Sequence, residues 1–119
     1  MTQHYVGTKI VVAWKQEKDG QPGYAVKYPD GYVSWSPQAQ FEAAYLAIGH
    51  IGHLPGHIQR MVAEHAELAD RILKLDAFTQ TETFMALPEL ERTDLFQQMA
   101  LMSQYKTVLK ARLERVRAQ

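Results

Sequence analysis

The hydrophobic pattern of this 119-residue chain changes its period near residue 50. Before that point, short runs rich in valine and aromatic residues alternate with turn residues, which is typical of half-buried β-strands. After it, apolar residues recur every three or four positions over long stretches, which indicates amphipathic helices. We therefore expect an α+β protein in which a small sheet module precedes a pair of long helices.

Three strands are predicted in the first part of the chain. Alternating apolar positions occupy residues 9–14, 24–28 and 32–35, and turn residues separate these runs. Between the second and third runs, Pro29 presets φ and Gly31 supplies a left-handed position, as a tight hairpin turn requires. The sequence thus predicts a three-stranded antiparallel meander.

A helix is predicted directly after the meander. Ser36 is expected to cap its amino end, and Pro37 to occupy its first position, where no amide hydrogen is needed. Apolar residues then recur at helical spacing, at Phe41, Tyr45 and Ile48, and Gly49 is the expected stop. Residues 1–49 are therefore predicted to form one module of meander plus helix.

Residues 58–119 are predicted to form a long antiparallel two-helix hairpin. The first helix has a seam with steps of three and four, formed by Ile58, Met61, His65, Leu68, Ile72 and Leu75. His65 is its polar member and is expected to be hydrogen-bonded at an interface. After Pro88, a second stripe comprises Leu95, Met99, Met102, Leu109, Leu113 and Val116. Flanking apolar residues make it wider than one helix covers, so we expect part of it to pack on the sheet module or on a second chain. Of the two, we favour homo-oligomerisation through the hairpin.

Charge and composition narrow the choice of partners. Thirteen basic side chains balance thirteen acidic ones, so we expect no nucleic-acid and no membrane partner. Within the hairpin, however, residues 57–104 carry a net charge of −4 and residues 105–119 carry +4. Cysteine is absent and no long apolar run suggests a signal peptide or a membrane span. These features predict a cytoplasmic protein.

Residues 50–57 form a joint rich in histidine and glycine. Its histidines, His50, His53 and His57, have a spacing at which imidazoles can bind zinc or nickel. The cluster contains no carboxylate, and its glycines and proline argue against one rigid helix that presents three ligands. We expect neither a metal nor another cofactor.

The sequence indicates binding more than catalysis. It has no nucleophile elbow, P-loop or Rossmann glycine pattern, so we do not expect an enzyme. Aromatic side chains that could stack on a nucleobase are Tyr28, Tyr32 and Trp35. Arginines that could hold phosphates at a subunit interface are Arg71, Arg112 and Arg115. The alternative is that the aromatic residues pack on the first helix and that the arginines are solvated. For each residue considered individually, we favour this alternative.

Two segments resemble known phage families. The strings YVGTK (residues 5–9) and GYAVKYPDGYVSWSP (residues 23–37), the latter followed by FE-x2-Y, resemble a small module of tailed-phage proteins. That module often precedes a domain of the second Thoeris anti-defence family, whose members sequester cyclic ADP-ribose-type immune signals. Here the connection before Gly23 is shorter and that domain is absent. Residues 75–113 resemble the helical hairpin of a family from crAss-like and other tailed phages, at Phe78, Phe84, Leu87, Met102, Tyr105, Leu109 and Arg112.

The resemblance implies a phage accessory protein that acts on host defence in the bacterial cytoplasm, and it transfers no site residue. The leading hypothesis is a non-enzymatic homo-oligomer that sequesters a cyclic-nucleotide or cyclic ADP-ribose-type signal. The alternative is a protein-binding inhibitor or adaptor that contacts a host defence protein, such as a CRISPR or restriction component. A structural role in virion assembly is a third interpretation.

Overall fold

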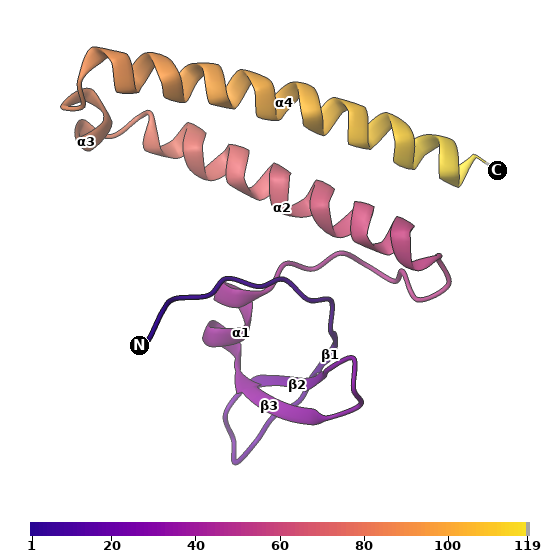
Figure 1. The fold of residues 1–119 in the computed structure, drawn as a ribbon. Coiled ribbons are helices and arrows are strands. Elements are labelled where there is room, and N and C mark those ends of the chain that lie inside the picture. Colours follow the sequence, from indigo (N-terminus) through magenta and orange to yellow (C-terminus); the bar gives the residue numbers. More distant parts are fainter. Residues whose placement is uncertain (119) are drawn as a thin grey trace. The chain divides into compact units, whose positions relative to one another are not determined.

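The computed structural model describes residues 1–118, whose contacts define two compact units. The meander unit, Met1–Ala47, contains the strands β1 (Val12–Lys15), β2 (Gly23–Lys27) and β3 (Val33–Pro37) and the helix α1 (Gln38–Ala44). The hairpin unit starts at Ile48 and contains α2 (Gly56–Phe78), α3 (Glu82–Met85) and α4 (Glu89–Arg117) (Figure 1). The predicted α+β class, with a three-stranded meander and a helical hairpin, is confirmed.

The meander is an antiparallel sheet with the strand order β1-β2-β3. Asp19 and Gly20 both have positive φ angles, 52° and 79°, and form the tight turn between β1 and β2. In the next turn, Gly31 has a φ of 92°, which confirms the predicted left-handed position. The carboxylate of Asp30 accepts a hydrogen bond of 3.0 Å from the backbone N–H of Tyr32, which fixes this turn further.

One face of the sheet packs against α1 through aromatic side chains. The Tyr24 ring of β2 stacks on Phe41 with a centroid distance of 4.3 Å, and Phe41 stacks on Tyr45 at 4.9 Å. Val26, two positions after Tyr24, shares its face of β2 and is fully buried. These residues form the core of the meander unit.

Three local predictions for the meander unit are wrong. Ser36 does not cap the helix, because it is still paired with Tyr24 in β3 and its hydroxyl donates to the carbonyl of Pro37. Pro37 therefore precedes α1 and does not occupy its first turn. β1 starts at Val12 and not at residue 9, because its partner strand ends at Lys27, the residue that pairs with Val12.

The end of α1 also differs from the prediction. The helix ends at Ala44, and Tyr45 is already extended, with a φ of −131°. Ile48 matched the helical spacing, but its side chain packs against the core of the hairpin unit. Gly49 has a positive φ of 81° and lies in the connecting segment, so it is not a helix stop.

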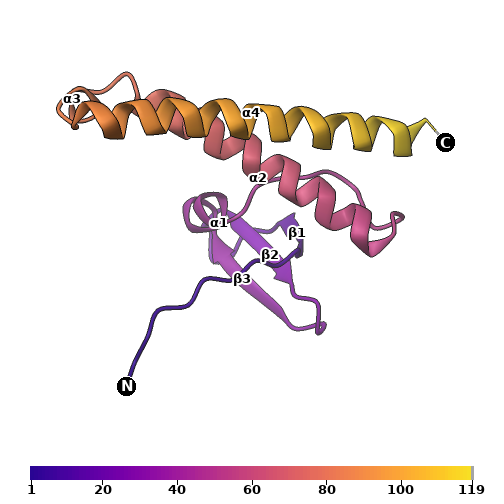
Figure 2. The same ribbon diagram turned by 45° about the horizontal axis from the view of Figure 1, so that its top comes forward.

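In the hairpin unit, α2 and α4 pack side by side in opposite directions, and α3 lies at the turn between them (Figures 1 and 2). The core consists of Ile58, Met61, Val62, Leu68, Leu109 and Leu113, which confirms the predicted seam. Ile48, Ile51 and Leu54 precede α2 and cover one part of this core. The segment that was predicted to be a joint therefore packs onto the helices along part of its length.

At the turn, the short helix α3 is anchored by one cap and one aromatic plug. The hydroxyl of Thr81 accepts a hydrogen bond of 3.2 Å from the backbone N–H of Phe84. The buried Phe84 ring meets Phe78 and Phe96 edge to face, at 5.9 and 5.3 Å between centroids. These contacts close the end of the hairpin.

His65 departs from its predicted role within a single chain. Its Nε2 atom is buried and has no hydrogen-bond partner among residues 1–118. The expected hydrogen bond is therefore not found.

Within residues 1–118, no helix is both long enough and apolar enough to cross a bilayer.

Candidate functional site

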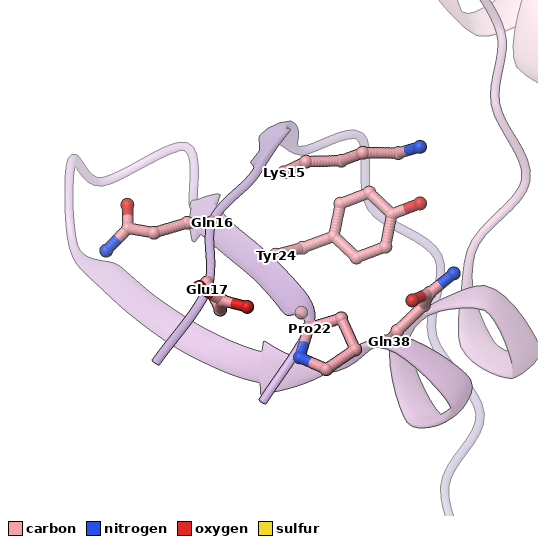
Figure 3. Close-up of a pocket in the computed structure, with 7 residues that line it drawn as sticks. Lys15, Gln16, Glu17, Pro22, Tyr24 and Gln38 are labelled. Carbon is pink, nitrogen blue, oxygen red and sulfur yellow. The ribbon is translucent and has the colours of Figure 1, made fainter. Parts of the chain in front are cut away.

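The meander unit contains an open hollow of about 320 Å³, which we call the meander hollow (Figure 3). It is lined by Lys15, Gln16, Glu17, Pro22, Gly23, Tyr24 and Gln38. Lys15 and Tyr24 extend in the same direction, whereas the side chain of Gln16 points away (Figure 3). Because Lys15 and Glu17 carry opposite charges, this hollow does not favour one sign of ligand charge.

The hydroxyl group of Tyr24, one of the residues that line the meander hollow, already has a hydrogen-bond partner. The Tyr24 hydroxyl donates a hydrogen bond of 2.8 Å to the carboxylate of Glu42. This bond raises the pKa of Tyr24 above its ordinary value, with smaller contributions from burial and from the negative charge of Glu42. The hydroxyl therefore stays protonated and bound to Glu42 at neutral pH.

Trp35 has a structural position in the sheet. Its indole N–H donates a hydrogen bond of 2.7 Å to the carbonyl of Gln16, and the Lys18 ammonium lies 5.6 Å from its ring centroid. A Cβ atom on Gly23 would lie 2.4 Å from the Trp35 ring, so the ring occupies the space that a side chain would need. Trp35 is therefore held across β2, close to the turn between β1 and β2.

Tyr28 and Tyr32 lie at the other turn. Their rings stack with a centroid distance of 6.0 Å, and the Lys9 ammonium lies 4.7 Å from the Tyr28 centroid. The structure thus brings two of the three predicted aromatic residues together and leaves Trp35 apart. None of the three lines the meander hollow.

A second hollow, the hairpin hollow, has a volume of about 220 Å³ and lies where the C-terminal end of α4 meets the start of α2. Its apolar walls are Ile48, Ile51, Leu54, Ile58, Val62, Leu113 and Val116. Its polar side chains are His50, His53 and Arg117, and no carboxylate is among the described residues that line it. This hollow therefore combines an apolar surface with groups that are neutral or cationic.

The predicted arginines are not gathered in one chain. The Tyr105 hydroxyl donates to the Glu64 carboxylate, which fixes the register of α4 against α2. Arg71 is seven positions after Glu64, and Arg112 is seven positions after Tyr105. Because the helices run in opposite directions at 1.5 Å per residue, these arginines lie about 21 Å apart along the hairpin. Arg115 is one turn beyond Arg112, and none of the three lines the hairpin hollow.

The Tyr105–Glu64 contact joins the two long helices. The hydrogen bond to Glu64 raises the pKa of Tyr105, as do burial and the charge of Glu64, while Arg112 opposes the shift. Residues 1–118 contain no ion pair between Glu64 or Glu67 and the basic residues that follow Tyr105. A neutral hydroxyl takes that place.

The three candidate histidines are divided between two environments. His50 and His53 line the hairpin hollow, whereas His57 is exposed near the start of α2. Within the described part of the chain, no three histidine, aspartate or glutamate side chains are grouped closely enough to hold a metal ion.

Sequence reasoning missed Arg117 and the wall formed by residues 48–54. Two features of the sequence could have indicated them. Residues 105–119 carry a net charge of +4, and Ile48, Ile51 and Leu54 are spaced by three positions. The glycines among them suggested a loose joint, so their common packing on the hairpin was not predicted.

A model of the Sequestin family matches residues 55–115 of the chain. This segment is just over half of the chain and covers α2, α3 and most of α4. Comparison with curated proteins and with solved structures gave no match. The paired helices are thus the part that carries the relationship, and the chain belongs to the Sequestin family.

Proposed function

We propose that this protein sequesters a small anionic nucleotide signal, of the cyclic-nucleotide or cyclic ADP-ribose type, without converting it chemically. The family name Sequestin refers to sequestration, and the family match includes three apolar residues of the hairpin hollow, Ile58, Val62 and Leu113. Arg117 and both histidines lie outside the matched residues. The observation that carries the proposal is the hairpin hollow itself. Its apolar walls lie beside Arg117 and two histidines, and the described residues that line it include no carboxylate.

The lining of the hairpin hollow suits the two parts of such a ligand. The aliphatic side chains of Val62, Leu113 and Val116 offer a surface for a base or a ribose. The planar guanidinium of Arg117 can donate two parallel hydrogen bonds to a phosphate, and the imidazoles of His50 and His53 offer further hydrogen bonds. Binding of this kind requires affinity and no catalytic group.

The biological setting follows from the resemblance of the chain to phage proteins. In an infected bacterium, a phage protein that holds an immune signal keeps it away from the effector that the signal activates. The protein would then act in the host cytoplasm as an anti-defence factor. Its capacity would depend on its concentration relative to that of the signal.

Calorimetry against cyclic ADP-ribose isomers and cyclic di- and trinucleotides tests the proposal. We expect one ligand class to bind and to be recovered unchanged after the protein is denatured. Arg117→Gln should weaken binding by about tenfold or more, because a charged hydrogen bond to phosphate is lost. Arg71→Gln removes an equally exposed arginine that is remote from the hollow, so it should leave the affinity unchanged.

Four results would count against this proposal. Absence of binding across the whole panel would overturn it. An equal loss of affinity in both arginine variants would place the ligand outside the hairpin hollow. Recovery of altered ligand would show turnover in place of sequestration. A stoichiometric host protein retained from lysate, with no small ligand bound, would favour the protein-binding alternative.

A further inference from the structure

The helix α4 carries a second seam of seven-residue periodicity on its exposed side, which we call the α4 seam. Steps of three and four lead from Glu91 to Arg115, and Gln98 is followed at the middle positions by three apolar side chains, Leu101, Tyr105 and Val108. This series is separate from the one that packs on α2, of which Leu109 and Leu113 lie in the core of the hairpin unit and Met102 and Val116 pack against it. One helix thus presents two seams, and α2 covers one of them.

The middle of the α4 seam is apolar and open to solvent. Leu101 is 57% exposed, Tyr105 45% and Val108 55%. Apolar side chains at successive positions of a seam are the pattern that a neighbouring helix packs against. A single exposed leucine needs no explanation, whereas a seam of three neighbouring apolar side chains points to a partner helix.

The two ends of the α4 seam carry opposite charges. Glu91 and Asp94 lie at the amino-terminal end, and Arg112 and Arg115 lie at the carboxyl-terminal end. All four are exposed, and none of them is in an ion pair within residues 1–118. A parallel partner helix of the same sequence would meet like charges at both ends, while an antiparallel one would meet opposite charges.

We infer that a second copy of this chain docks its α4 antiparallel along the α4 seam, across a two-fold axis at residue 103. In this register, Leu101 of one copy faces Tyr105 of the other, Asp94 faces Arg112, and Glu91 faces Arg115. Because a two-fold interface is isologous, each of these pairs occurs twice. The two hairpins then form a four-helix bundle.

The mirror arrangement of the charges identifies the partner as the same chain. Asp94 and Arg112 each lie nine positions from residue 103, and Glu91 and Arg115 each lie twelve positions from it. A different partner would need charges complementary to those of α4. It would not require the charges of α4 themselves to be arranged symmetrically about one point. Only self-association makes this symmetry useful.

The assembly is independent of the proposed ligand site. No residue of the α4 seam lines the hairpin hollow, and Tyr105 keeps its hydrogen bond to Glu64 along the edge of the seam. Failure of self-association and failure of nucleotide binding are therefore separate results.

A charge-reversal experiment tests the interface and its register together. Sedimentation velocity over a range of concentrations should show a dimer for the unchanged protein. Asp94→Arg alone and Arg112→Asp alone should each raise the dimer dissociation constant by at least about tenfold, because each homodimer then contains two like-charge contacts. An equimolar mixture of the two variants should recover the dimer, since both cross-pairs become attractive. The double variant Asp94→Arg/Arg112→Asp should also be dimeric.

Matched controls separate this effect from misfolding. Asp76→Arg and Lys110→Asp reverse exposed charges of the same signs outside the α4 seam, so they should leave the dimer intact. The helical circular dichroism of all variants should match that of the unchanged protein. A monomer at every concentration, dimers that survive both single reversals, or a mixture that stays monomeric would each overturn the inference.

Discussion

Gly23 shows how a single residue depends on pairing that is remote in the sequence. The indole of Trp35 lies where a side chain at position 23 would be, and the carbonyl oxygen of Ser36 is 2.5 Å from that point. Nothing near Gly23 in the sequence indicates this role, because it arises from the register of β2 against β3. By contrast, Gly31 could be predicted, because its turn is defined by its immediate neighbours.

The first prediction is that Gly23→Ala destabilises the meander unit. The added methyl group would meet both the Trp35 ring and backbone, so we expect a loss of about 1–3 kcal/mol in unfolding free energy. Urea denaturation followed by tryptophan fluorescence measures it. Gly7→Ala is the control, because no atom lies within 4 Å of the added Cβ and the φ angle there is ordinary. Equal stability of the two variants would show that Trp35 does not occupy that space.

At the scale of elements, hydrophobic periodicity predicted the two long helices well and the two ends of the short helix α1 poorly. The seam residues of α2 and α4 form the core as expected, because a long amphipathic pattern has few other ways to be buried. Ile48 also matched a helical pattern, but it belongs to the hairpin unit and packs on the core of that unit, and strand pairing keeps Ser36 in β3. Tertiary contacts decide whether such a residue joins a helix or the element next to it. A local sequence pattern does not contain those contacts.

The second prediction contrasts two leucines of the hairpin. Leu109 is 1% exposed in the core between α2 and α4, whereas Leu73 is 70% exposed on α2. Leu109→Ala should lower the unfolding free energy by about 2–5 kcal/mol, since it removes buried methyl groups and leaves a cavity. Leu73→Ala should change it by less than about 0.5 kcal/mol. Chemical denaturation followed at 222 nm compares them, and similar losses would mean that the hairpin core is misplaced.

At the scale of the whole molecule, the two units have separate cores and separate optical signals. Both tryptophans of the chain, Trp14 and Trp35, lie in the meander unit, whereas the two long helices lie in the hairpin unit. Fluorescence therefore reports on one unit and helical circular dichroism mainly on the other. The division at residue 47 places the candidate ligand site wholly in the hairpin unit.

The third prediction is that substitutions separate these two signals. Gly23→Ala should lower the thermal midpoint seen by fluorescence and leave the midpoint at 222 nm in place. Leu109→Ala should have the reverse effect, because each change acts on one core. If both midpoints shift together in both variants, the units unfold as one cooperative body.

The candidate site could be anticipated only in outline. The sequence showed that the end of the chain is basic and that histidines precede the hairpin, but it did not show that residues 48–54 fold back onto the helices. The six predicted ligand residues line neither hollow. A concave surface is made by segments that meet in space, and composition does not reveal which of them meet.

The wall contributed by residues 48–54 also bears on how such proteins diversify. The family match starts at residue 55, so three apolar walls and both histidines of the hairpin hollow precede it, and Val116 and Arg117 lie beyond its end at residue 115. Under the proposed function, relatives could exchange this short stretch and change the preferred signal while the paired helices stay the same. Differences in ligand preference between relatives would then come mainly from these seven residues. The sequence of the paired helices would show little of that difference.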